Sequence, residues 1–297
     1  MVEKPRHIRY TQSMTISERN VFFKAGIAFS CVVALLAVAA SFLIIPVYTG
    51  AENGLFPGLH ENTLRPGNFS QIVTGRLLER DYYAVHASVA LAVLFSLFGM
   101  IFIYSFFERT SAPEILYISF FVISFSFEIF RFVLPLNFVY NFSLFYLLGS
   151  SRILLFARYF GVFSLFLASV RAAGLEAQKT RNIIMILIIA VLLFTIGIPV
   201  DIQTWDTSYY SASGYSLMFK MIEAAIFLAM ILTFFVAAKV RDSSDYIHVG
   251  IGVLFAIAGR NTLIGTDNWV GPVMGIFLLS FGIWYVCSKL HRIHLWL

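Results

Sequence analysis

Apolar runs of about 20 residues recur along almost the whole of this 297-residue chain. About 20 apolar residues are needed for a helix to cross the hydrocarbon core of a membrane, where every backbone polar group must be bonded internally. Only 12% of the residues are charged, against about 25% in soluble domains. We therefore expect an all-α, polytopic membrane protein with eight spans, at 26–48, 84–107, 114–136, 151–173, 182–200, 214–238, 246–265 and 269–290.

Lysine and arginine outside the predicted spans gather on one side of the membrane. If the N-terminus is cytoplasmic, thirteen of the 21 basic residues fall in inside segments and three fall outside. Because cytoplasmic loops carry the excess of positive charge, we expect both termini in the cytoplasm. The chain then divides into a basic N-terminal segment (1–25), a signal-anchor helix (26–48), an outside loop (49–83), a seven-helix bundle (84–290) and a short tail (291–297).

Charged residues interrupt four of the predicted spans at similar depths. At 1.5 Å per residue, six of them lie about 8–13 Å below the outer surface, and the inner halves of these spans carry no charge apart from Glu114 and Arg171 at the inner ends. A seventh, Arg152, and the histidine His86 lie closer to that surface. The six deeper residues are Glu128, Arg131, Arg158, Lys220, Glu223 and Arg260.

The spacing of these residues predicts common helix faces. Ser124, Glu128, Arg131 and Pro135 follow a 4-3-4 pattern, which places them on one face of an α-helix. Lys220 and Glu223 are also neighbours on a helix, three residues apart.

An ionised side chain at mid-membrane costs about 2.5–3.5 kcal/mol, so such residues face a bundle interior or a watery cavity. Two acids against five bases leave three positive charges. We expect an outward-opening pocket that binds an anionic or strongly polar group, with Asn261 supporting Arg260, and Arg152 and His86 near its rim. The structural alternative is that buried pairs such as Glu128–Arg131 fix helix packing.

Other signals carry less weight. The pattern GPVMG, Gly271 to Gly275, predicts close helix packing. The segment 137–150 is too short to span and is expected to be re-entrant or interfacial. His291 and His294 are expected to contact lipid headgroups. The cysteines Cys31 and Cys287 suggest neither a disulfide nor a metal site, and the sequence indicates no cofactor, no metal and no nucleic-acid partner.

A signal-like span, an outside segment and seven further spans resemble the bacterial seven-transmembrane receptors with diverse intracellular signalling modules. The stretches GIFLLSFGIWYVCSKLHRI (275–293) and FFERTSAPEILYISFF (106–121) resemble the final helix and the first cytoplasmic turn of that module. The chain departs from the pattern in having only the loop 49–83 outside, and no kinase, cyclase or phosphatase module. The resemblance implies a sensory membrane core that signals through a separate protein, and supplies no site residues.

From these observations we expect a non-enzymatic, sensor-like protein of a bacterial inner membrane. It would bind an anionic or polar ligand, a lipid headgroup among the candidates, and act through partner proteins. Three alternatives stay open: a transporter or channel subunit, a structural or assembly subunit of a larger complex, and an integral-membrane enzyme acting on lipid headgroups. The enzyme would use Glu128 or Glu223 as general base, but the sequence shows no nucleophile or metal motif.

Overall fold

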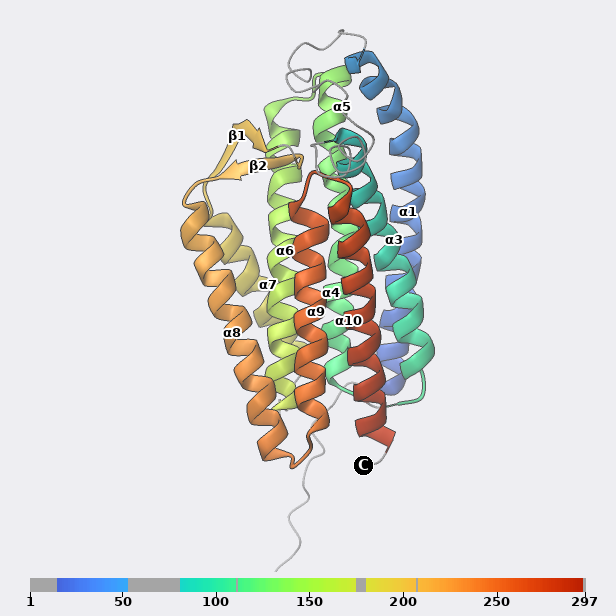
Figure 1. Cartoon of the computed structure of the whole chain (residues 1–297), viewed down its shortest axis with the longest axis vertical. Helices are drawn as coiled ribbons and strands as arrows, with labels where there is room; N and C mark the ends of the chain where they lie inside the picture. The colour runs from blue at the N-terminus through green and yellow to red at the C-terminus, as the bar shows by residue number, and fades with distance from the viewer. Residues whose placement is uncertain (1–14, 53–80, 111, 175–179, 207, 296–297) are drawn as a thin grey trace, which may run out of the picture.

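The protein is a bundle of long helices with one β-hairpin at one end (Figure 1). The computed structural model describes residues 15–52, 81–110, 112–174, 180–206 and 208–295. Within these ranges, seven helical stretches are long and apolar enough to cross a membrane, so the chain is an integral membrane protein of the helical class. Most of the predicted segments 1–25 and 49–83 lie outside the described residues. The seven stretches are α1 (Ile16–Glu52), α3 (Tyr82–Phe107), the composite α4–η2–α5, α6 (Leu144–Ala172), α8 (Ser216–Val240), α9 (Asp245–Gly265) and α10 (Val270–Leu295).

The predicted span 182–200 is divided between a helix and a strand. Helix α7 (Thr180–Ile196) has 17 residues, shorter than the other apolar helices, and it is followed by Gly197 and Pro199, which disfavour its continuation. Strand β1 (Val200–Asp206) then pairs antiparallel with β2 (Tyr210–Ser213). The predicted spans 182–200 and 214–238 left only a connecting loop here, and the structure forms it as a β-hairpin.

The two ends of the bundle are distinct. The hairpin end carries β1 and β2, and the C-terminal end lies opposite, where α10 finishes (Figure 1). At the hairpin end, the indole Nε1 of Trp269 donates a hydrogen bond of 2.6 Å to Asp81, the residue that caps the start of α3. Asp81 thereby joins the beginnings of α3 and α10.

The apolar segment 137–150 is not a re-entrant piece of its own but is shared between two helices. Helix α5 (Val133–Tyr140) ends at Asn141, which adopts a left-handed conformation with φ of 47°, and α6 begins after Ser143. Asparagine tolerates this conformation better than most residues, which makes it a helix stop. The segment therefore forms the end of one helix, a tight turn and the start of the next.

The middle of the third long stretch is wound as a 3-10 helix. Helix α4 (Glu114–Ser124) runs into η2 (Phe125–Phe132) and then into α5. Pro135 has no amide proton to donate to the carbonyl of Arg131, and its ring crowds that carbonyl, which weakens α-helical bonding just before it. A 3-10 helix has about 3.0 residues per turn. Glu128 and Arg131 consequently stay on one face, whereas the predicted common face with Ser124 and Pro135 is not kept.

Helices α9 and α10 approach each other through glycines. A Cβ atom on Gly259 would lie 2.3 Å from the backbone nitrogen of Leu279, and one on Gly275 would lie 2.6 Å from the backbone nitrogen of Leu263. No side chain fits at such distances, so these glycines allow backbone-to-backbone contact. The predicted close packing at GPVMG is confirmed, and it fixes the helix that carries Arg260.

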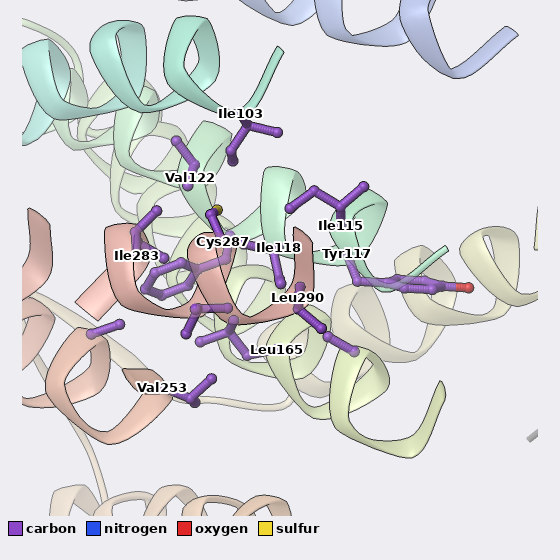
Figure 2. Close-up of a cluster of buried hydrophobic side chains, with 14 of the residues drawn as sticks. Ile103, Ile115, Tyr117, Ile118, Val122, Leu165, Val253, Ile283, Cys287 and Leu290 are labelled. Carbon is purple, nitrogen blue, oxygen red and sulfur yellow. The ribbon is translucent and has the colours of Figure 1, made fainter. Parts of the chain in front are cut away.

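A dry hydrophobic core fills the bundle towards the C-terminal end. Figure 2 shows side chains from α4, α6, α9 and α10 meeting there, among them Ile118, Leu165, Val253 and Cys287. All four are at most 2% exposed. Lipid tails are as apolar as these side chains, so helices inside a membrane are held together mainly by van der Waals contacts between closely packed side chains.

Polar contacts attach α1 to the rest of the bundle. The hydroxyl groups of Ser30, Ser96 and Ser126 lie within 2.7–3.2 Å of one another, joining α1, α3 and η2. Near the C-terminal end, the guanidinium of Arg19 donates hydrogen bonds to the carbonyls of Phe107 and Thr110. Helix α1 is thus held by specific contacts at two depths.

Candidate functional site

The charged residues predicted to share a layer come from four elements that meet near the hairpin end. Glu128 and Arg131 lie on η2, and Arg158 lies on α6. Lys220 and Glu223 lie on α8, while Arg260 and Asn261 lie on α9. The structure brings six of these residues into two contact groups, one centred on Glu128 and one on Arg260, while Lys220 lines the cavity beside them.

Glu128 is the centre of a buried ion-pair group. Its side chain is 2% exposed, and both of its carboxylate oxygens accept hydrogen bonds of 2.8 Å from Arg158, one from Nε and one from Nη2. Nη1 of Arg131 lies 3.6 Å from Oε2 of the same carboxylate. Paired hydrogen bonds between a guanidinium and a carboxylate are strong and directional, so the principal partner of Glu128 is on α6 and not on its own helix.

Arg131 links this group to the β-hairpin. It is 1% exposed and donates from Nε to the carbonyl oxygen of Ser208 at 2.9 Å, with Nη2 donating to the same oxygen. Its Nη1 also donates to the hydroxyl of Ser88 on α3 at 3.3 Å. Arg131 therefore interacts with backbone and hydroxyl oxygens, which offset part of its charge, and it shares Glu128 with Arg158.

Arg260 forms the second group with residues of α8 and α9. Its Nη1 donates to Glu223 at 2.7 Å and to the side-chain oxygen of Asn261 at 2.9 Å. Its Nη2 donates to the backbone carbonyl of Arg158 at 3.3 Å. Asn261 thus supports Arg260, and the carbonyl contact joins the two groups along α6.

A cavity of about 470 Å³ lies between α6, α8 and α9. Charged residues from both groups line it, together with Phe219, Phe227 and Ile264 on its apolar walls. Phe219, Ile264 and Arg260 are buried, whereas Lys220 and Asn261 are exposed. The cavity is therefore deepest towards Arg260 and opens sideways, at the surface of the bundle, between α8 and α9.

Lys220 is the cation of this layer that lacks an acidic partner. Within the described part of the chain it makes no ion pair, although Glu223 is only three residues away and also lines the cavity. Glu223 pairs with Arg260 instead. The cavity walls carry Arg158, Lys220 and Arg260 against Glu223, and the buried Glu128 balances one further charge. Positive charge remains in excess at the opening.

Two predicted rim residues lie away from the cavity lining. Arg152 donates from Nη1 to the carbonyls of Thr195 and Ile198 at 2.7 and 2.5 Å, and so satisfies backbone groups at the end of α7. His86 hydrogen-bonds with the hydroxyl of Ser41 at 2.9 Å and stacks on a phenylalanine ring of η2. Both residues support helix contacts near the hairpin end.

One buried acid away from the cavity was not among the residues predicted from the sequence. Glu114, the first residue of α4, is 1% exposed. Among the described residues its carboxylate has no hydrogen bond, and its nearest cationic groups are His294 at 3.4 Å and Arg241 at 4.0 Å. Pro113 directly precedes α4, and proline is common where a helix begins. It was the one signal in the sequence for a turn at this position.

The two histidines near the chain end also contact protein groups. His294 faces Glu114, and Nδ1 of His291 lies 3.4 Å from the hydroxyl of Thr110. These contacts join the end of α10 to the connection between α3 and α4, and contact of the two histidines with lipid headgroups stays a prediction.

The chemistry available in the cavity is recognition of negative charge. Two guanidinium groups and an ammonium supply hydrogen-bond donors, and arginine suits carboxylate and phosphate groups with two oxygens. No group of histidine, cysteine, aspartate and glutamate among the described residues has the arrangement to hold a metal ion. Compared with known proteins, the chain matches no protein-family model and no curated protein.

Proposed function

We propose that this protein is a non-enzymatic, sensor-like membrane protein that binds an anionic group in the cavity between α6, α8 and α9. The observation that carries the proposal is Lys220, an exposed cation without an acidic partner among the described residues, which lines the cavity together with Arg260 and Arg158. A lysine in the membrane region is unfavourable unless it meets water or an anion. An anionic ligand would compensate its charge.

The apolar walls favour a ligand that is partly hydrophobic. Phe219, Phe227 and Ile264 line the same cavity as the cations, and the cavity opens at the side of the bundle. A lipid with an anionic headgroup, or a fatty acid or alkyl phosphate, offers both a charged end and an apolar chain. The shared chemistry is an oxyanion attached to a hydrocarbon tail.

The proposed setting is a bacterial inner membrane with the hairpin end outside and both termini in the cytoplasm. The distribution of lysine and arginine supports this orientation. Helix α7, with 17 residues, would cross as an eighth span, since 17 residues is about the shortest length that suffices. The cavity would then lie at the level of the outer leaflet.

The core in the C-terminal half supports binding over transport. Below the cavity, residues such as Val253, Ile283 and Leu290 pack in a dry cluster (Figure 2). A transported ion or polar solute would need a polar path through this region. The ligand's arrival would instead be passed on through the helices to a partner protein at the cytoplasmic side, as the resemblance to the receptor family implies.

Binding to purified protein in nanodiscs tests the proposal. The probe is a fluorescent decyl phosphate, measured with wild-type protein and with Lys220→Gln, and the matched control is Lys239→Gln, on the same helix at its other end. We expect Lys220→Gln to weaken binding about tenfold or more, since a hydrogen bond to a charged group is worth about 1.5–3 kcal/mol. Equal affinity of the two variants would refute the proposed site.

Phosphatidylglycerol and phosphatidylcholine nanodiscs distinguish the source of the anion. If membrane lipid is the natural occupant, phosphatidylglycerol in the disc will displace decyl phosphate, whereas phosphatidylcholine, whose headgroup is zwitterionic, will not. Displacement by neither lipid would assign the cavity to a water-borne amphiphile.

A further inference from the structure

A continuous series of contacts leads from the cavity to the tip of the β-hairpin. Arg158 lines the cavity and holds Glu128 through two hydrogen bonds. Glu128 lies 3.6 Å from Arg131, and Arg131 donates two hydrogen bonds to the carbonyl of Ser208. Glu128, Arg131 and Ser208 are buried and Arg158 is partly buried, so a change at one end alters the electrostatic balance at the next.

The hairpin is also connected to the cavity through the chain itself. Its tip packs into the bundle, where Tyr209 is 5% exposed and its ring stacks parallel to that of Tyr82, with centroids 6.3 Å apart. Its base is closed by a hydrogen bond from Gly214 to the carbonyl of Pro199, directly before the start of α8. Figure 1 shows the two strands above the ends of α7 and α8. Movement of the tip therefore bears on the helix that carries Lys220.

An oxyanion in the cavity competes with Glu128 for the guanidinium of Arg158. A carboxylate or phosphate can accept the same pair of hydrogen bonds that the carboxylate of Glu128 now accepts. Glu128 is 2% exposed and would be left as an uncompensated buried charge, which is strongly unfavourable. Arg131 is the other cation beside it, and its Nη1, which donates to Ser88, lies 3.6 Å from the carboxylate. To offer Glu128 the pair of hydrogen bonds that Arg158 gives up, Arg131 has to turn Nη2 as well as Nη1 towards it, and this withdraws Nη2 from the carbonyl of Ser208.

We propose that occupation of the cavity transfers Glu128 from Arg158 to Arg131 and thereby releases the carbonyl of Ser208 at the hairpin tip. This rests on the proposed function, since it assumes that the cavity binds an oxyanion. Binding and release are thermodynamically linked. An anion loosens the hairpin, and a firmly held hairpin lowers the affinity for the anion. The hairpin would be the part of the protein that reports occupation at the outer surface.

Hydrogen–deuterium exchange of residues 200–213, followed by mass spectrometry, measures the release. Saturating decyl phosphate should speed amide exchange in this segment about tenfold, because the backbone loses a charge-assisted anchor. Sodium decanoate, a second tailed oxyanion, should act in the same direction, and decyl maltoside, which carries no charge, should not. If decyl phosphate binds in the same samples and exchange of 200–213 is unchanged or slower, the transfer is wrong.

A second arm needs no ligand and separates this inference from the proposed function. In Arg158→Met, Arg131 is the one cation that stays within ion-pair distance of Glu128 among the described residues. Exchange of 200–213 should therefore be fast from the start, and decyl phosphate should add nothing. Arg158→Lys, which keeps the charge and one hydrogen bond, should lie between Met and wild type. Glu223→Gln is the matched control, because it breaks the pair with Arg260 while leaving Glu128 in place.

The outcomes are distinguishable. If exchange is fast in Arg158→Met but wild-type protein does not bind decyl phosphate, the series of contacts from Arg158 to Ser208 is supported and the proposed ligand is refuted. If decyl phosphate binding depends on Lys220 but amide exchange of 200–213 is slow in both Arg158 variants, the transfer of Glu128 is refuted and the binding function is supported. Fast exchange of 200–213 in Glu223→Gln would also refute the transfer, since the hairpin would then loosen on the loss of any ion pair in the layer.

Discussion

Two buried glutamates, one near each end of the bundle, carry the same charge in very different ways. Glu128 and Glu114 are 2% and 1% exposed, respectively. Glu128 accepts two hydrogen bonds from Arg158 and lies beside Arg131. Within the described residues Glu114 accepts none, and it faces His294 and the partly exposed Arg241 at 3.4 and 4.0 Å. Two equally buried carboxylates can therefore be held very differently, depending on the number of their hydrogen bonds and the distance to their cationic partners.

The largest expected effect belongs to the fully paired acid. Glu128→Gln leaves the buried guanidinium of Arg131 and the partly buried one of Arg158 without their shared anion, and breaking a buried ion pair from one side costs about 3–5 kcal/mol. We expect the free energy of unfolding in mixed detergent micelles to fall by that amount. A loss no greater than that of Glu114→Gln would show that the two sites do not differ as their geometry suggests.

The next effect is the coupling between Glu128 and Arg158. In a double-mutant cycle with Glu128→Gln and Arg158→Met, the combined loss should be smaller than the sum of the single losses by about 2 kcal/mol, because either change already removes the paired hydrogen bonds. The same unfolding measurement gives all four corners of the cycle. Additive losses would mean that the pair contributes little, and that each residue acts through other contacts.

A smaller change of opposite sign is expected at the C-terminal end. Glu114→Gln removes a buried charge that no described hydrogen bond compensates, so the protein should become more stable by about 1 kcal/mol. Arg241 is 32% exposed and remains accessible to water after the change. A clear loss of stability would contradict the view that Glu114 is loosely held.

The smallest effect concerns the histidine that faces Glu114. His294→Lys places a permanent positive charge near the carboxylate and should raise stability by about 0.5 kcal/mol. His294→Gln serves as the uncharged control. The gain should vanish when Glu114 is also changed to Gln, and if it persists, the lysine stabilises the protein through some other group.

Seven of the eight expected spans, and the grouping of charged residues near one end of the bundle, were predictable because both follow from one-dimensional arithmetic. The length of an apolar run decides whether a helix can cross the membrane, and the depth of a charged residue within it follows from the rise of 1.5 Å per residue. The residues Glu128, Arg158, Lys220 and Arg260 accordingly lie near one end of the bundle, as expected.

Pairing between helices was not predictable from the same arithmetic. The sequence suggested Glu128 with Arg131 and Lys220 with Glu223, since neighbours on one helix are visible in the spacing. The structure has Glu128 with Arg158 and Glu223 with Arg260 as its closest pairs, which depend on the order of helices around the bundle. The 3-10 segment was missed because apolar composition does not distinguish its backbone from an α-helix. The hairpin was missed because its polar sequence, VDIQTWDTSYYSAS, lies between two predicted spans and was assigned to a connecting loop.

The hydroxyl contacts of Ser30 have a consequence for how the protein is made. Helix α1 leaves the ribosome before α3 and η2, which carry Ser96 and Ser126, its partners in the folded protein. Until both have entered the membrane, the Ser30 hydroxyl has only the carbonyls of its own helix to bond. Docking of the first helix is therefore completed only after the third long stretch is synthesised, so a segment that looks like a targeting signal is also one of the later pieces to settle during assembly.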